Sequence, residues 1–161
     1  MKELLDQYAI YTGWAHKRLL DVINTLSAEQ QHQEVISSFS SLYKTVYHVW
    51  GAETVWLRRF SKEIAVAPED RFNGSMAELS DGLMEVDQQL LRCVLSKTEE
   101  ELMGTLAYSN LRGQPFNQPL NILLMHVFNH STYHNGQLVT MLRQLHADNI
   151  PETDFVAWSR L

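Results

Sequence analysis

Apolar residues recur at steps of three and four along four long stretches of this chain. In the first stretch, from Glu3 to Leu26, they are Leu4, Tyr8, Tyr11, Ala15, Leu19, Val22 and Leu26. This spacing places them on one face of an α-helix. The same pattern predicts further long helices over residues 41–61, 75–94 and 120–146. Four long amphipathic helices are typical of an all-α four-helix bundle, because each must bury its apolar face against the others.

Capping and turn residues separate these helices. Ser27 is followed three positions later by Gln30, which predicts a capped helical turn, and Ser75 is placed to cap the third long helix. Pro68 and the pair Asn73–Gly74 indicate a loop between the second and third long helices. These signals support the division of the chain into four long helices with short connections.

The segment 104–119 has a different pattern. Its apolar residues alternate with small or polar ones, Gly113 can form a turn, and Pro115 and Pro119 oppose a helix. We expect a short hairpin or an extended loop here, inserted just before the last long helix. A single helical turn is expected on each side of the bundle's last helix, over residues 97–103 and 153–158.

Length, charge and cysteine content narrow the class of protein. The 161 residues fit one domain, 1–161, of ordinary hydrophobic content. A net charge of −6 argues against a nucleic-acid partner, since phosphate binding needs a basic surface. No apolar run is long enough to cross a membrane, and no secretory leader is visible, so no membrane partner is expected. Cys93 is the only cysteine, which excludes an internal disulfide and fits a cytoplasmic protein.

The strongest candidate for chemistry is a histidine series in the fourth long helix. His126, His130 and His134 are each four residues from the next, so they follow one another along one side of the helix. A His-x-x-x-His pair can direct two imidazoles at one divalent cation. A third ligand is needed, and His48 is the candidate, because small side chains such as Ala52 leave space beside it.

Helical phase separates the members of this series. With about 100° of rotation per residue, His134 lies within roughly 20° of the bundle-facing direction, His130 within about 50°, and His126 about 90° away. His130 and His134 are therefore the inward pair, and two buried imidazoles are costly unless they are hydrogen-bonded or bound to an ion. The remaining histidines lack a nearby ligand on the same face and are expected to be structural or exposed; they are His16, His32 and His146.

Other catalytic patterns are absent from the sequence. Ser131 follows His130, so there is no His-Glu-x-x-His protease motif, and neither a G-x-S-x-G elbow nor a glycine-rich phosphate loop is present. Glu53 lies about 140° around the helix from His48, so the two side chains should not converge. We expect Glu53 either to orient a ligand or to form half of a buried ion pair. Candidate pocket walls are the aromatic residues Tyr47, Trp50, Trp56, Tyr108 and Tyr133.

Two stretches together resemble the DinB (YfiT-like) superfamily. They read YHVWGAETVW at 47–56 and HVFNHSTYHNGQL at 126–138, and the likeness extends to the turn 110–113 and the closing segment 153–155. The resemblance implies an up-down-down-up bundle and a divalent metal held by His48, His130 and His134. Nickel or zinc is typical of the family, and iron is a further option. It also implies a homodimer. Asn135 departs from the pattern, since an arginine is common there.

The resemblance also indicates a function. Relatives of known activity are metal-dependent thiol transferases or isomerases that use bacillithiol, mycothiol or glutathione. The predicted function is therefore a metal-dependent transferase whose partners are a low-molecular-weight thiol and a small electrophile. Two alternatives remain. A metal-dependent hydrolase would activate water at the same ion. A non-catalytic metal-binding stress-response protein would fit the lack of an identifiable general base, and no catalytic residue beyond the ligands is assigned.

Overall fold

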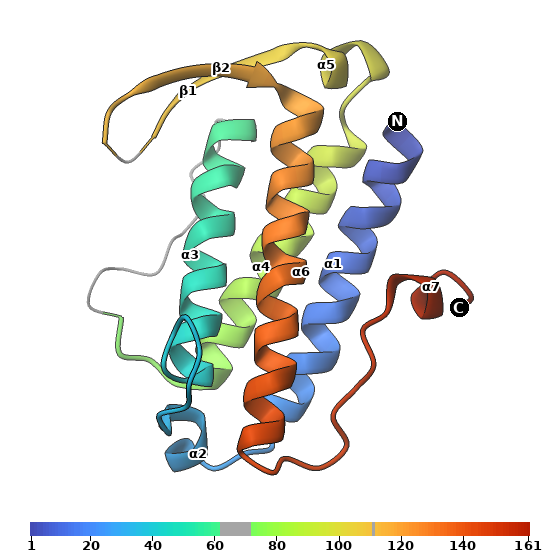
Figure 1. Cartoon of the computed structure of the whole chain (residues 1–161). Helices are drawn as coiled ribbons and strands as arrows, with labels where there is room; N and C mark the ends of the chain where they lie inside the picture. The colour runs from blue at the N-terminus through green and yellow to red at the C-terminus, as the bar shows by residue number, and fades with distance from the viewer. Residues whose placement is uncertain (62–71, 111) are drawn as a thin grey trace.

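Four long helices form the body of the protein (Figure 1). The computed structural model describes residues 1–61, 72–110 and 112–161. The long helices are α1 (Lys2–Ile23), α3 (Leu42–Ser61), α4 (Met76–Leu95) and α6 (Leu120–Gln144). Helices α1 and α6 run in one direction, whereas α3 and α4 run in the other. Both α4 and α6 pack against α1 and α3. The predicted up-down-down-up four-helix bundle is confirmed.

The helix ends follow the predicted caps, with small shifts. Ser27 and Gln30 exchange the two hydrogen bonds of a capping box at the start of α2 (Ala28–His32), and Ser75 begins α4 in the same way. The short helices α5 (Glu99–Met103) and α7 (Phe155–Trp158) match the expected single turns. Helix α6 ends at Gln144, two residues before the predicted end, because His146 takes a left-handed conformation with φ of 54°.

The insertion before the last helix is a hairpin rather than an extended loop. Strands β1 (Thr105–Ser109) and β2 (Pro115–Pro119) pair antiparallel across one end of the bundle (Figure 1). The side chain of Asn110 accepts hydrogen bonds from two backbone amides of the turn, and Gly113 supplies the positive φ that the turn needs. Asn73 and Gly74 are irregular as expected, whereas Pro68 lies outside the described residues.

The apolar face of each long helix supplies the core. The inward positions predicted for α6 are all buried; they are Leu123, Val127, Leu138, Met141 and Leu145. Cys93 is also buried. Among the residues that the structure describes, no helix combines the length and the apolar character needed to span a membrane. The histidines of α3 and α6 thus lie on rigid elements that pack against each other.

A close approach between α3 and α4 gives a first prediction. A Cβ added at Gly82 would lie 2.4 Å from Cζ2 of Trp50, whose ring is buried. Gly82→Ala is therefore expected to lower the free energy of unfolding by about 1–3 kcal/mol through overpacking. Urea unfolding followed by circular dichroism measures this change in the free energy of unfolding. Gly136→Ala in α6 is the control, since nothing lies within 4 Å of its added Cβ, and it should gain up to about 1 kcal/mol. Equal stability of Gly82→Ala and the unmodified chain would contradict the expectation.

Candidate metal centre

Three imidazole rings from two helices meet at one point of the bundle. His130 Nε2 lies 3.1 Å from His48 Nε2 and 3.1 Å from His134 Nε2. The candidate ligand atoms of the three residues all lie within 4.8 Å of one another. The structure therefore brings together the three histidines selected from the sequence. Their role as metal ligands stays a prediction.

The hydrogen bonds around the rings fit a cation at their meeting point. Gln137 donates from Nε2 to Ser38 Oγ, which leaves its Oε1 to accept from His134 Nδ1 at 2.8 Å. His134 then carries its proton on Nδ1 and presents the Nε2 lone pair to the other rings. A proton on His130 Nε2 could be donated to only one of its two neighbours. A divalent cation would engage all three nitrogens, so the residues present fit such an ion.

Burial keeps these rings neutral. Desolvation, together with the neighbouring rings of His134 and His48, lowers the pKa of His130 to about 4. Desolvation also lowers the pKa of His48 and that of His134. Neutral imidazole is the form that binds metal ions, so few protons need to be displaced at neutral pH.

The exposure of the α6 histidines follows the phase argument. His134 is 3% exposed and His130 is half-buried, whereas His126 is on the surface with its ring centroid 5.3 Å from that of Trp56. His126 is thus not part of the three-ring cluster. Of the other histidines, His32 and His146 are exposed, and His16 is buried in the core.

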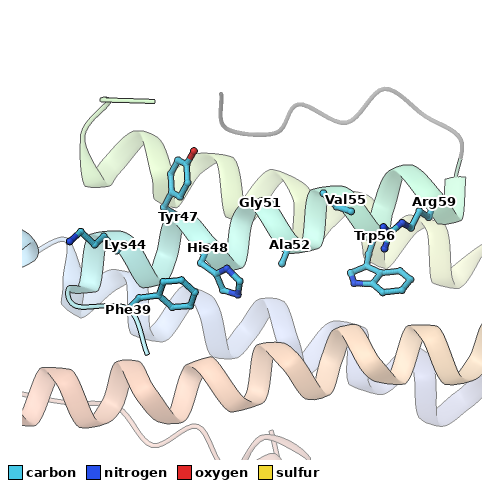
Figure 2. Close-up of a pocket in the computed structure, with 9 residues that line it drawn as sticks. All are labelled: Phe39, Lys44, Tyr47, His48, Gly51, Ala52, Val55, Trp56 and Arg59. Atoms are coloured by element: carbon cyan, nitrogen blue, oxygen red, sulfur yellow. The ribbon is translucent and has the colours of Figure 1, made fainter. Parts of the chain in front are cut away.

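A cavity of about 500 Å³ lies along α3 and shares His48 with the cluster (Figure 2). Its lining is almost wholly apolar, and Gly51 and Ala52 provide room. The ring of Phe39 stacks on that of His48 with centroids 4.2 Å apart. The full lining is Phe39, Lys44, Tyr47, His48, Gly51, Ala52, Val55, Trp56 and Arg59. A small molecule in this cavity would therefore lie directly beside one of the three imidazoles.

The predicted pocket walls are only partly found in this lining. Tyr47 and Trp56 line the cavity. Trp50 instead packs in the core against Gly82, and Tyr108 lies behind Trp56 with ring centroids 5.2 Å apart. Tyr133 lies on the exposed side of α6. Helical phase predicts that an aromatic residue points inward, but it does not decide whether the residue meets a cavity or another helix.

Asn135 points away from the three-ring cluster. Its side chain is buried, its Oδ1 has no hydrogen-bond partner in the described part of the chain, and it lines a separate cavity beside Tyr8 and Tyr11 of α1. An anion or thiol contact from this position would therefore be made in a different cavity from the one that contains His48.

Glu53 belongs to a different group of side chains from His48. It is fully buried and lies with His16 of α1 and Asp87 of α4, whose ligand atoms are within 4.8 Å of one another. His16 Nδ1 is 2.9 Å from an Asp87 oxygen, and Ser131 donates to Glu53 Oε1 at 2.5 Å. As expected from helical phase, Glu53 and His48 do not converge. The group itself was not foreseen, because its members come from three separate helices.

Sequence reasoning also missed the residues that surround the rings. Gln137 follows His134 by three positions, so a helical neighbour rule could have identified it as the partner of the ring. Ser38 and Phe39 come from a serine-rich connection whose sequence carries no such signal.

Comparison with known proteins identifies the family of this chain. The profile of the DinB family matches residues 1–157. Protein DinB of Bacillus subtilis (strain 168) is 28% identical over 153 residues, which cover 90% of this chain and 87% of the relative. A DinB-like crystal structure from Bacillus cereus ATCC 10987 superposes with a TM-score of 0.66 at 21% identity, covering 86% of this chain and 89% of that one. A structure assigned to the DinB family from Exiguobacterium sibiricum 255-15 gives 0.69 at 17% identity, covering 95% and 97%. The chain therefore belongs to the DinB family.

Proposed function

We propose that this protein is a metal-dependent transferase that joins a low-molecular-weight thiol to a small electrophile. His48, His130 and His134 would hold the ion, with nickel or zinc as the first candidates. The observation that carries the proposal is the meeting of three neutral ring nitrogens beside an apolar cavity. A divalent cation held there would supply Lewis acidity that lowers the pKa of a neighbouring thiol toward neutrality.

The chain's own residues supply the binding site for the electrophile. The cavity along α3 is apolar, so it favours an apolar substrate beside His48. Phe39 covers the face of the His48 ring and limits access from the direction of the 36–41 connection.

Two cations flank this apolar lining and suit a substrate with an anionic end. Lys44 and Arg59 lie fifteen positions apart on the α3 side that borders the cavity (Figure 2). The guanidinium of Arg59 is held in place over the rings of Trp56 and Tyr108 and donates to the Ser109 carbonyl. The negatively charged group of such a substrate, or of a thiol cofactor, would contact Lys44 or Arg59. The apolar part of the same molecule would fill the space beside Ala52.

The test is thiol transfer by the metal-loaded chain. Bacillithiol, mycothiol and glutathione are each supplied with an aromatic electrophile, and thioether formation is followed with and without a chelator. We expect turnover that the chelator abolishes and that His134→Ala reduces by about 100-fold or more. Turnover insensitive to both would refute the proposal. Stoichiometric metal binding without turnover, for every thiol, would favour the non-catalytic alternative. Sedimentation of the same samples tests the homodimer that the family resemblance implies.

A further inference from the structure

A second cluster of potential ligands lies inside the bundle, away from the three-ring cluster. It consists of His16 on α1, Glu53 on α3 and Asp87 on α4, which are 1%, 0% and 5% exposed. Carboxylates and imidazoles are rarely buried this completely unless their charges and hydrogen-bonding atoms are matched. These three buried groups therefore need partners for their charges and for their hydrogen-bonding atoms.

Two buried atoms of the cluster have no hydrogen-bond partner among the residues that the structure describes. His16 Nδ1 contacts both oxygens of Asp87, at 2.9 and 3.2 Å, and Glu53 Oε1 accepts from Ser131. Glu53 Oε2 and His16 Nε2 are buried and have no partner in the described part of the chain. A carboxylate oxygen of Glu53 also lies within 4.8 Å of one of Asp87. Two buried carboxyl groups this near to each other are stabilised by a proton or a cation between them.

We propose that His16, Glu53 and Asp87 form a second divalent-cation site, suited to an ion that accepts mixed nitrogen and oxygen ligands, such as Mn²⁺, Fe²⁺ or Zn²⁺. One ligand atom from each residue lies within 4.8 Å of the others. Around an ion with bonds of about 2.1 Å, neighbouring ligand atoms are about 3 Å apart, which is the separation found between His16 Nδ1 and the Asp87 oxygens.

Charge supports a divalent ion. Two carboxylates and a neutral imidazole carry two negative charges, which a divalent cation neutralises without any other buried charge. In the cation-free chain the same balance requires protons on both His16 and Glu53, and the raised pKa values of His16 (about 9) and Glu53 (about 8) describe that protonated form. Desolvation is the largest cause at both residues: it raises the pKa of Glu53, whereas at His16 it lowers the pKa and is outweighed by the charges of Asp87 and Glu53 together with the hydrogen bond to Asp87. Two protons, one on His16 and one on Glu53, are therefore the alternative to a divalent cation at this cluster.

The two clusters should differ in the ions they prefer. Three imidazoles suit nickel, zinc and copper, whereas two carboxylates with one imidazole are better ligands for manganese and iron. The clusters are neighbours, because Ser131, which donates to Glu53, follows His130 on α6. A cation at this second cluster would need no thiol chemistry, and it would bind whether or not the chain is a transferase.

Manganese counting tests the second site. The chain with His130→Ala, which removes the central ring of the first cluster, is stripped by a chelator and equilibrated with Mn²⁺ both in the folded state and during refolding from urea. Bound manganese is then counted by mass spectrometry after dialysis. We expect one ion per chain for His130→Ala and none for His130→Ala with Glu53→Gln. The control is His130→Ala with Glu85→Gln, an exposed change on α4 that should keep the ion. No bound manganese in His130→Ala, or the same amount with Glu53→Gln, would overturn the proposal.

A second measurement covers the case in which Glu53→Gln fails to fold, as judged by circular dichroism. Crystals of the unmodified chain grown with Mn²⁺ are measured at the manganese absorption edge. An anomalous peak within bonding distance of His16, Glu53 and Asp87 supports the site. An empty cluster at saturating Mn²⁺ overturns it and leaves the proton pair as the occupant.

Discussion

Replacing His130 with alanine is expected to weaken the binding of Ni²⁺ by about 100-fold or more. His130 is the central ring of the cluster, because its Nε2 is the atom that lies 3.1 Å from both of the other ring nitrogens. Even residues that only orient a ligand change affinity by about 10–100-fold, so the loss of a ligand should cost at least as much. Competition with a chromophoric chelator measures the affinity. Nickel is the ion of choice, since imidazole ligands favour it over the carboxylate-rich cluster.

His126→Ala is the matched control for this change. It lies one turn before His130 on α6, is exposed, and faces Trp56 rather than the other rings. Its nickel affinity should equal that of the unmodified chain. A loss of affinity in His126→Ala as large as in His130→Ala would mean that nickel binds to surface histidines, and the proposed centre would lose its support.

The helices could be predicted because the spacing of apolar residues within each helix has the period of an α-helix. Of the seven residues expected on the inward face between Leu4 and Leu26, Tyr11, Ala15 and Leu19 are buried, whereas Leu4 is exposed and Leu26 lies beyond the end of α1. The period of the helix was thus predicted better than the centre of its buried face, and the capping pair Ser27–Gln30 marks where the next turn begins. The same local rule ranks the α6 histidines correctly, since the direction of a side chain from its helix depends only on sequence position. Each of these predictions concerns one helix alone.

Contacts between helices could not be predicted in the same way. Asp87 reaches His16 because α4 packs against α1 at one particular axial position, and nothing within either helix fixes that position. The location of Trp50 in the core has the same cause, since it depends on Gly82 of α4. Spacing along α6 cannot locate the third histidine of the candidate centre for this reason, because His48 is on α3. It was chosen from the small side chains beside it and from the family resemblance.

Removing the Asp87 carboxyl is expected to produce the largest loss of stability. In the cation-free chain, Asp87→Ala leaves the buried His16 imidazolium without its closest counter-charge. The free energy of unfolding should fall by on the order of 3 kcal/mol near pH 6, because breaking a buried ion pair leaves an uncompensated charge. Asp81→Ala, an exposed change on the same helix, should stay within about 0.5 kcal/mol. Urea unfolding in the presence of a chelator compares the two, and a loss in Asp87→Ala no larger than in Asp81→Ala would refute the ion pair.

The pH dependence of that loss provides a further check. The titratable groups that interact with His16 are Asp87 on α4, Glu53 on α3, and His130 and His134 on α6. The pKa of His16 rises from 6.5 when unfolded to about 9 when folded, so its ion pair stabilises the fold fully below pH 6.5 and no longer does so once the pH has risen through 9. The raised pKa of Glu53, about 8, acts in the same direction, because the folded chain again binds the proton more tightly. The stability of the unmodified chain should therefore decline between pH 6 and 9, by on the order of 1 kcal/mol per pH unit for each group that is protonated in the folded chain and deprotonated in the unfolded chain. The gap to Asp87→Ala should narrow over the same range, whereas a gap that stayed constant to pH 10 would show that His16 is not the charged partner.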